Sequence, residues 1–134
     1  MFAWIRLAEL LLGIIFLGAG LNGYVVLFGF EAFAPTSPEA MEFLGEGYFL
    51  ALEKGVEIIA GVFLLIRRFV PLTLMILASI IVNIVAFHLF VDSDLLLLAL
   101  FVTVLEGILV WHYRESYKEL LKSKPKVSTL KSGK

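Results

Sequence analysis

The stretch that decides the fold is FVPLTLMILASIIVNIVAFHLF, residues 69–90, which contains no Asp, Glu, Lys or Arg. A helix needs about 20 apolar residues to cross the hydrocarbon core of a bilayer, and this stretch has that length. Three further apolar stretches lie around it, at Trp4–Phe30, Tyr48–Ile66 and Leu95–Tyr113. Because four strands are too few to close a barrel, only helices would satisfy the backbone hydrogen bonds in hydrocarbon. We therefore predict an all-α integral membrane protein, a bundle of four transmembrane helices.

The composition of the whole chain agrees with this fold class. Of the 134 residues, 60% are hydrophobic and 17% are charged, against about 45–50% and about 25% in soluble domains. The first apolar stretch continues past Gly20 to Phe30, so we expect an uncleaved helix rather than a cleaved signal peptide. The net charge of -1 argues against nucleic acid as a partner. The lack of cysteine excludes disulfides, thiol redox chemistry and thiolate metal sites within this chain.

The basic residues predict how the four helices are oriented. Arg6 precedes the first helix, and Arg67 and Arg68 lie between the second and the third. A run of basic residues follows the fourth helix: Arg114, Lys118, Lys122, Lys124 and Lys126. The other two connections contain no Lys or Arg, so the positive-inside rule places both termini in the cytoplasm. We divide the chain into a transmembrane domain, 1–113, and a basic cytoplasmic tail, 114–134, a frayed helix end followed by disorder.

The polar connections predict where the helices begin and end. The longest connection, Glu31–Gly47, contains a Pro-Thr-Ser-Pro turn signal and enough apolar residues for a short amphipathic piece at the membrane interface. Pro71 suits the first turn of the third helix, where its missing N–H costs nothing. Either Asp92 or Asp94 is placed to cap the fourth helix.

Polar residues within the predicted spans are the first candidates for function, because burying a charge in the membrane costs about 2.5–3.5 kcal/mol on insertion scales. Five residues in the outer half form the candidate ligand-binding set: Asn22, Glu53, Glu57, Asn83 and His88. Glu53 and Glu57 lie four residues apart, on one helix face and about 6 Å apart along the axis. Two carboxylates so close require either a proton on one of them or an ion pair with Lys54.

Two members of this set lie on the third helix. Asn83 shares a face with Ser79 and Ala86, which predicts contact with a neighbouring helix. His88 follows five residues later, about 140° around the helix, so we expect it at the outer boundary or against a different neighbour. If His88 and the two glutamates line one outward-facing cavity, the imidazole is suited to exchange protons near neutral pH. The alternatives are structural: charged side chains that reach to water, an interhelical hydrogen bond from Asn83 and an interfacial aromatic ring at His88.

In the inner half, one face of the first helix carries a stripe of small and charged residues: Arg6, Glu9, Gly13, Phe16, Gly20 and Gly23. Its glycines would allow another helix backbone to approach closely, and Arg6 can pair with Glu9. Glu106, about seven residues from the inner boundary of the fourth helix, completes the inner-half candidates with Arg6 and Glu9. His88 and His112 are separated by depth, so we expect no haem or metal site, and no catalytic motif is present.

Three segments resemble the DoxX family of small four-helix bacterial membrane proteins: RLAELLLGIIFLGAGLN at 6–22, EIIAGVFLL at 57–65 and NIVAFH at 83–88. The resemblance covers Ile5–Tyr113, nearly the whole chain outside the tail. It implies a four-helix bundle in the bacterial inner membrane, associated with membrane redox systems. Some members of that family are subunits that pass electrons from sulfur compounds to quinone, others belong to thiol or oxidative-stress complexes, and distant eukaryotic relatives are cargo receptors or assembly chaperones.

Three functions therefore remain open. The first is an accessory subunit of a membrane redox system that binds a quinone or similar lipophilic ligand in a polar intramembrane pocket and works with a membrane-bound or soluble redox partner. The second is a non-enzymatic scaffold or chaperone that recognises partner helices through its polar spans. The third is a small proton-coupled transporter that acts as a homodimer. The residues do not decide whether the protein is an enzyme, and quinone is the one cofactor that they and the resemblance suggest.

Overall fold

The computed structural model describes residues 3–34, 36–45 and 47–124, and in these residues it is all-α without a strand. The elements are α1 (Ala3–Leu27), α2 (Pro38–Leu44), α3 (Tyr48–Ile66), α4 (Val70–Phe90), α5 (Leu96–His112) and a 3-10 helix, η1 (Arg114–Tyr117). Each of the four long apolar stretches forms one helix, within three residues of the expected ends. The short piece expected in the first connection is α2.

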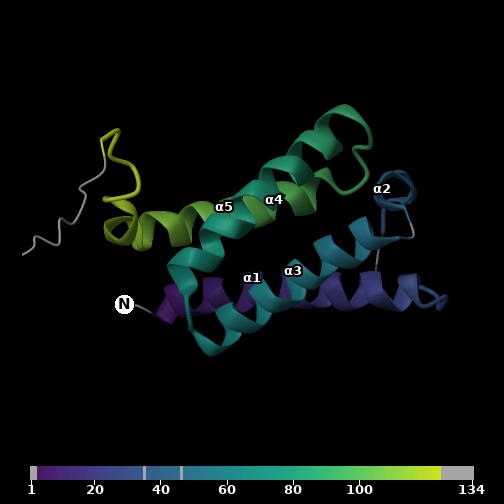
Figure 1. Cartoon of the computed structure of the whole chain (residues 1–134), viewed down its shortest axis with the longest axis horizontal. Helices are drawn as coiled ribbons and strands as arrows, with labels where there is room; N and C mark the ends of the chain where they lie inside the picture. Colours follow the sequence, from purple (N-terminus) through teal and green to yellow (C-terminus); the bar gives the residue numbers. More distant parts are fainter. Residues whose placement is uncertain (1–2, 35, 46, 125–134) are drawn as a thin grey trace, which may run out of the picture.

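The four long helices form two antiparallel pairs that meet at one end and separate toward the other (Figure 1). α1 packs along α3 over most of its length, and α4 packs on α5. The pairs are joined by smaller contacts of α1 with α5 and of α3 with α4. We call the end at the α3–α4 turn, residues 67–69, the closed end, and the end at which α2 lies the open end.

The apolar core lies in the half of the bundle next to the closed end. It is built from the first halves of α1 and α4 and the second halves of α3 and α5, with Leu12, Leu64, Leu74 and Leu109 among its fully buried members. A packed core is expected where all four helices meet, because apolar side chains from each helix then fill the space between them. Among the described residues, the half next to the open end has no comparable core, and the five residues of the predicted ligand-binding set lie there.

Glycines allow α1 and α3 to pack backbone against backbone. A Cβ added at Gly61 would lie 2.7 Å from the carbonyl oxygen of Gly13 and 2.7 Å from the backbone nitrogen of Leu17. A Cβ added at Gly20 would lie 2.7 Å from the carbonyl oxygen of Lys54. The close approach predicted from the glycine stripe of the first helix is thus confirmed, with α3 as the partner helix.

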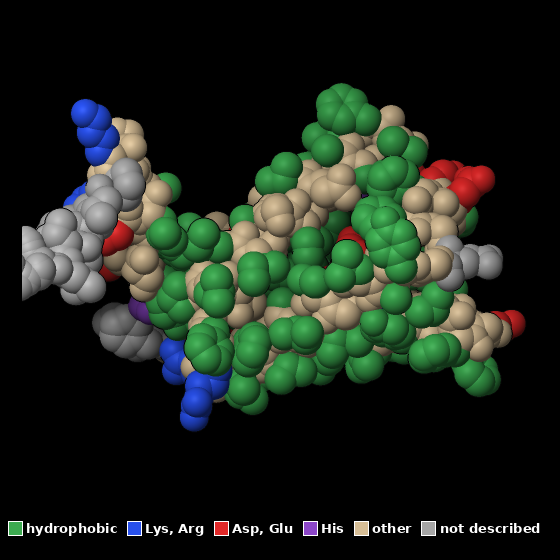
Figure 2. Space-filling view, viewed as in Figure 1, with side chains coloured by type: hydrophobic (Ala, Val, Ile, Leu, Met, Phe, Trp, Pro, Cys, Tyr) green, Lys and Arg blue, Asp and Glu red, His purple; other side chains and the backbone are tan. Residues whose placement is uncertain are grey.

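Apolar side chains cover the outside of the bundle as well as its interior (Figure 2). Large exposed hydrophobic residues occur on all four long helices, for example Ile14, Ile59, Val82 and Leu97. By length and composition α1 and α4 could each cross a membrane. α3 contains the three charged residues 53, 54 and 57, and α5 has 17 residues, somewhat fewer than a full span needs.

The connections confirm one expectation and correct another. Pro71 lies in the first turn of α4, as predicted. The prediction that Asp92 or Asp94 caps the last long helix is wrong, because α5 begins after Leu95 and no side chain caps it. The Asp92 carboxylate instead accepts hydrogen bonds from the Ser37 hydroxyl and, at 3.1 Å, from the backbone N–H of Asp94. It therefore joins the turn between α4 and α5 to the start of α2.

The chain after α5 turns back onto the bundle. The frayed helix end expected there is η1, and the Tyr117 side chain is buried, with its hydroxyl donating to the carbonyl oxygen of Pro71 at 2.8 Å. The disorder expected for the remainder of the tail concerns residues 125–134, which lie outside the described residues.

Candidate functional site

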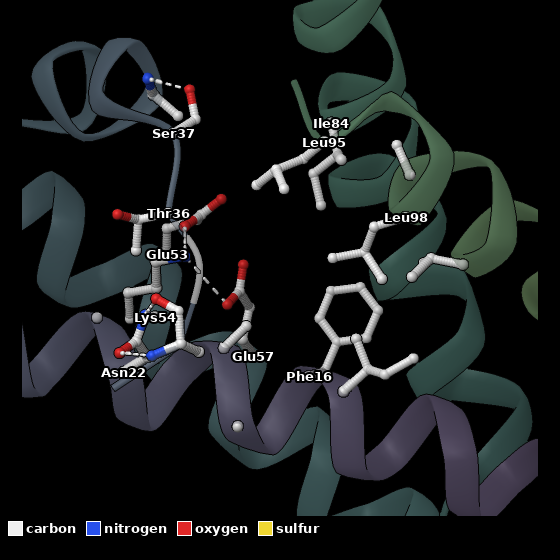
Figure 3. Close-up of a pocket in the computed structure, with 18 of the residues that line it drawn as sticks. Phe16, Asn22, Thr36, Ser37, Glu53, Lys54, Glu57, Ile84, Leu95 and Leu98 are labelled. Atoms are coloured by element: carbon white, nitrogen blue, oxygen red, sulfur yellow. Dashed lines mark hydrogen bonds and ion pairs between the residues drawn. The ribbon is translucent and has the colours of Figure 1, made fainter. Parts of the chain in front are cut away.

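A cavity of about 390 Å³ lies near the open end, between the α1–α3 pair and the α4–α5 pair (Figure 3). Its lining comes from all five α-helices, α1 to α5, and from the connection between α1 and α2. The lining includes every member of the predicted ligand-binding set, together with Lys54: Asn22, Glu53, Glu57, Asn83 and His88. In Figure 2 an acidic side chain is visible through a hollow in the apolar side of the bundle. Asn22 and His88, which are 66 positions apart in the chain, thus face the same cavity.

The α3 wall of the cavity carries three charged side chains around one cation. The Nζ of Lys54 lies 3.5 Å from Glu53 Oε1 and 3.3 Å from Glu57 Oε1, so Lys54 pairs with both carboxylates and not with one alone. The Glu57 side chain is only 3% exposed. A Cβ at Gly23 would come within 2.4 Å of Lys54 Cγ, so the lysine stem passes over α1 where α1 has no side chain. This contact fixes the lysine between the two helices.

The α4 wall presents an imidazole and an amide. His88, 7% exposed and in the last turn of α4, has its Nδ1 2.7 Å from the carbonyl oxygen of Asp92. A carbonyl oxygen only accepts, so Nδ1 carries the proton and Nε2 of the neutral ring is left as an acceptor. Asn83 lines the same cavity, although its side chain is exposed. Ser79 and Ala86 are exposed too, so the expectation that this face of the helix packs on a neighbour is wrong.

Asn22 lines the cavity but is occupied by the backbone of the following connection. Its Oδ1 accepts from the N–H groups of Phe33 at 2.8 Å and Ala34 at 3.3 Å, and its Nδ2 donates to the carbonyl oxygen of Ala34 at 3.4 Å. These bonds satisfy backbone groups that would otherwise be buried without partners. Asn22 is therefore a positioning residue that holds the connection against the cavity.

α2 covers the open end of the cavity and is fixed there by Ser37. The Ser37 hydroxyl accepts from the N–H of Ala40 at 3.1 Å, which caps α2, and donates to Asp92. The hydrogen bond from Ser37, followed by that from the backbone of Asp94, lowers the pKa of Asp92. Sequence reasoning missed this contact. The Ser-Pro pair at 37–38 signals a helix start, but nothing in the spacing indicates a partner more than fifty residues away.

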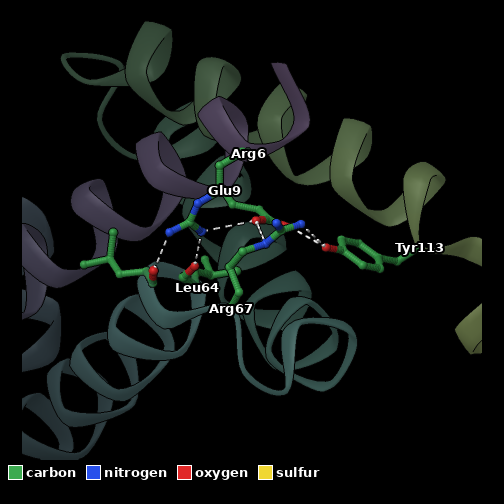
Figure 4. A network of polar contacts seen from close by, with 6 residues as sticks. Arg6, Glu9, Leu64, Arg67 and Tyr113 are labelled. Atoms are coloured by element: carbon green, nitrogen blue, oxygen red, sulfur yellow. Dashed lines mark hydrogen bonds and ion pairs between the residues drawn. The ribbon is translucent and has the colours of Figure 1, made fainter. Parts of the chain in front are cut away.

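Two of the three inner-half candidates, Arg6 and Glu9, belong to a different structure, a polar network at the closed end (Figure 4). Glu9, with 0% of its side chain exposed, accepts from Arg6 Nη1 at 3.3 Å, from Arg67 Nε at 2.8 Å and from the Tyr113 hydroxyl. The predicted Arg6–Glu9 pair is confirmed. Arg6 also donates to the carbonyl oxygens of Leu64 at 3.1 Å and Leu65 at 2.6 Å, which lie in the last turn of α3. The Leu64 carbonyl oxygen accepts as well from the backbone N–H of Arg67 at 3.3 Å.

Arg67 and Tyr113 are members of this network that sequence reasoning did not identify. Arg67 takes a left-handed conformation, φ 58°, at the end of α3, in the sharp turn that leads to α4. The hydroxyl of Tyr113 and the charge of Glu9 raise the pKa of Arg67 above its usual value. Sequence reasoning assigned them local roles, Arg67 as an orientation signal and Tyr113 as a helix end, because their partner Glu9 is far away in the chain.

Glu106 joins neither structure. Its side chain is only 6% exposed, and neither carboxylate oxygen has a hydrogen-bond partner among the described residues. It does not line the cavity and makes no ion pair with the residues of the Glu9 network. The three inner-half candidates are therefore split into a partnered pair, Arg6 and Glu9, and one isolated carboxyl group.

Comparisons with protein-family models, with curated proteins and with solved structures found no match to this chain. The resemblance to the DoxX family stays a prediction, and the site has to be interpreted from its own geometry.

Proposed function

We propose that this protein is a four-helix membrane protein that binds a lipophilic small molecule with a polar head in the cavity at its open end. In this arrangement α1, α3, α4 and α5 all cross the bilayer, and both termini are cytoplasmic. The apolar exterior supports a lipid environment, since water-soluble monomers rarely expose continuous apolar surface. Figure 2 shows Lys and Arg gathered near one end and several Asp and Glu at the other, which supports a cytoplasmic closed end.

The observation that carries the proposal is the meeting of polar groups in one apolar cavity. Ligand pockets measure about 300–1,000 Å³ and combine mostly apolar walls with a few well-placed polar groups, as this cavity does. Charged residues in a membrane are costly and are kept mainly where they serve a function. The Glu9 network at the closed end joins the helices, which offsets the cost of burying its charges. Glu57 and Lys54 form no part of that network, so the cost of burying them needs another explanation.

The DoxX resemblance adds a candidate role within this function. It suggests an accessory subunit of a membrane redox system, in which the lipophilic ligand is a quinone. A quinone needs an apolar slot, donors for its carbonyls and a group that exchanges protons. The Asn83 amide supplies a donor, and His88 supplies the proton-exchanging group.

The test is to purify the protein from its native membrane in mild detergent and to identify bound small molecules by mass spectrometry. A Cβ added at Gly18, which lines the cavity, meets nothing within 4 Å, so Gly18→Phe would fold and fill part of the space. Gly107→Phe is the matched control, because Gly107 is equally unobstructed and does not line the cavity. We expect a stoichiometric lipophilic ligand that is lost in Gly18→Phe and retained in Gly107→Phe.

A preparation without any ligand would contradict the proposal. If such a preparation carried a recurrent protein partner, the scaffold function would take its place, and the polar residues of the cavity would then be contacts for partner helices.

A further inference from the structure

The polar wall of the cavity has more acceptors than donors, and this imbalance bears on the ligand. Two carboxyl groups, Glu53 and Glu57, share one ammonium group, that of Lys54. Oε1 of Glu53 is buried and, although it lies at ion-pair distance from Lys54, it has no hydrogen-bond partner among the described residues. In an apolar surrounding the surplus carboxylate needs a neutralising partner, which is either a proton or a second cation.

Lys54 is not free to serve a ligand instead. Its stem crosses Gly23 at a distance that leaves no room for a side chain there, and its Nζ lies between both carboxylates. Of the described residues that line the cavity, Lys54 is the one Lys or Arg. An anionic head would therefore face two carboxyl groups without a cation of its own, and repulsion from them disfavours fatty acids and phosphates.

The rest of the lining favours a positive head. On the opposite wall the Nε2 of His88 is an acceptor when Nδ1 donates to Asp92. Four phenylalanines line the cavity, Phe16, Phe33, Phe43 and Phe87. Aromatic faces attract ammonium groups, and this attraction grows when the cation is removed from water.

We propose that the ligand of this cavity is a lipophilic amine, whose protonated nitrogen lies beside Glu53 and Glu57 and whose apolar body occupies the space between the two helix pairs. The inference rests on the proposed function, in that the cavity must be a ligand site. It gives the head group a positive charge, and in this it replaces the neutral quinone that the DoxX resemblance suggests. An ammonium group supplies both the second cation and the hydrogen-bond donor that the α3 wall lacks.

The test uses three probes with the same apolar body and different heads: 4-phenylbutylamine, 4-phenylbutanol and 4-phenylbutyrate. Binding is measured by calorimetry to the full chain in nanodiscs of uncharged phosphatidylcholine, with empty nanodiscs subtracted. We expect the amine to bind about tenfold or more tighter than the alcohol, which corresponds to about 1.4 kcal/mol, and the carboxylate to bind more weakly than both. Gly18→Phe should weaken all three, and Gly107→Phe should change none.

Variants of the wall give the inference a second, independent readout. Glu57→Gln should remove the preference for the amine over the alcohol. Glu115 forms an exposed ion pair with Lys118 outside the cavity, so Glu115→Gln should leave the preference unchanged. If Glu57→Gln does not fold, Lys54→Met, which keeps the stem over Gly23, should increase the preference for the amine.

The outcomes separate the two proposals. One outcome is that the three probes bind equally, or that the carboxylate binds tightest, and that Gly18→Phe abolishes this binding. It would overturn the proposal of an amine ligand and leave the proposal of a ligand site intact. A preference for the amine that persists in the Glu53→Gln/Glu57→Gln double variant would overturn the assignment of its partner. Binding of none of the probes, together with no ligand in the native preparation, would remove both proposals.

Discussion

The two ends of the bundle treat a buried carboxylate in opposite ways. At the closed end Glu9 alone receives two guanidinium groups and a tyrosine hydroxyl, and a packed apolar core lies beside it. At the open end Glu53 and Glu57 share one lysine, next to a cavity. A carboxylate with partners in excess holds elements together, because every charge is compensated within the fold. Under the proposed function, a ligand in the cavity supplies the charge that the carboxylates at the open end lack. We therefore expect the closed end to contribute most to stability and the open end to be the place of the proposed ligand binding.

The largest expected effect comes from breaking the closed end. Glu9→Gln leaves Arg6 and Arg67 without their common counter-charge, and we expect a loss of about 2–3 kcal/mol in the free energy of unfolding. The figure is below that for a fully buried pair because both arginines are partly exposed. Thermal unfolding in mild detergent, followed by circular dichroism, measures the change.

Glu57→Gln at the open end is the comparison variant for this experiment, and we expect it to cost less, since Lys54 keeps Glu53 as a partner. Glu115→Gln, on the surface, should have almost no effect. If Glu9→Gln proved no more destabilising than Glu57→Gln, the contrast between the two ends would be wrong.

A medium effect is expected from the glycines, because Gly61 lies where α1 and α3 are in backbone contact and Gly18 lies at the cavity. Gly61→Ala places a methyl group 2.7 Å from backbone atoms of α1, so the helices must separate, and we expect a cost of about 1–3 kcal/mol. Gly18→Ala, at the cavity, meets nothing within 4 Å and should leave stability unchanged or slightly raised, since alanine favours the helix. Unfolding of the two single variants, measured side by side, checks this. Equal losses would mean that the close approach of α1 and α3 at Gly61 does not restrict the side chain at that position.

The parts of this structure that sequence reasoning could predict are those encoded locally. The length of an apolar stretch sets the length of a helix in hydrocarbon, which is why residues 48–66 and 69–90 were expected almost as they are found. The glycine stripe of α1 was likewise visible from a spacing of three or four residues. Pro71 was placed in its helix turn because proline lacks an N–H.

The missed contacts are those between positions far apart in the chain. Asp92 was expected to cap its own helix, but it bonds to Ser37, because the fold brings α2 across the open end. Asn22 was a ligand candidate, but its amide is occupied by the connection after α1. The residue types indicated that each of these side chains would form hydrogen bonds. Which partner each of them bonds depends on the arrangement of the helices. The five cavity candidates were found by type and depth, whereas their common cavity follows from the separation of the two helix pairs.

The smallest expected effect concerns pH and the cover of the cavity. Hydrogen bonds from Ser37 and from the backbone of Asp94 hold the pKa of Asp92 below its ordinary value of 3.8, so the folded state favours the carboxylate. The stabilisation of α2 by this contact is then fully present above the ordinary pKa and is lost as the pH falls through the lowered one. Hydrogen exchange of the Ala40 amide, which donates to Ser37, reports the change once corrected for the intrinsic rate. We expect its protection to fall at acidic pH.

Two other titrating groups face Asp92, Glu39 and His88, and variants separate their contributions. Asp92→Asn should lower the protection of Ala40 at neutral pH and make it independent of acid, whereas Glu39→Gln should keep the acid step. If Asp92→Asn behaved like the unmodified chain at every pH, Ser37 would hold α2 through its cap alone, and the open end would be closed by apolar contacts such as that between Phe43 and Phe87.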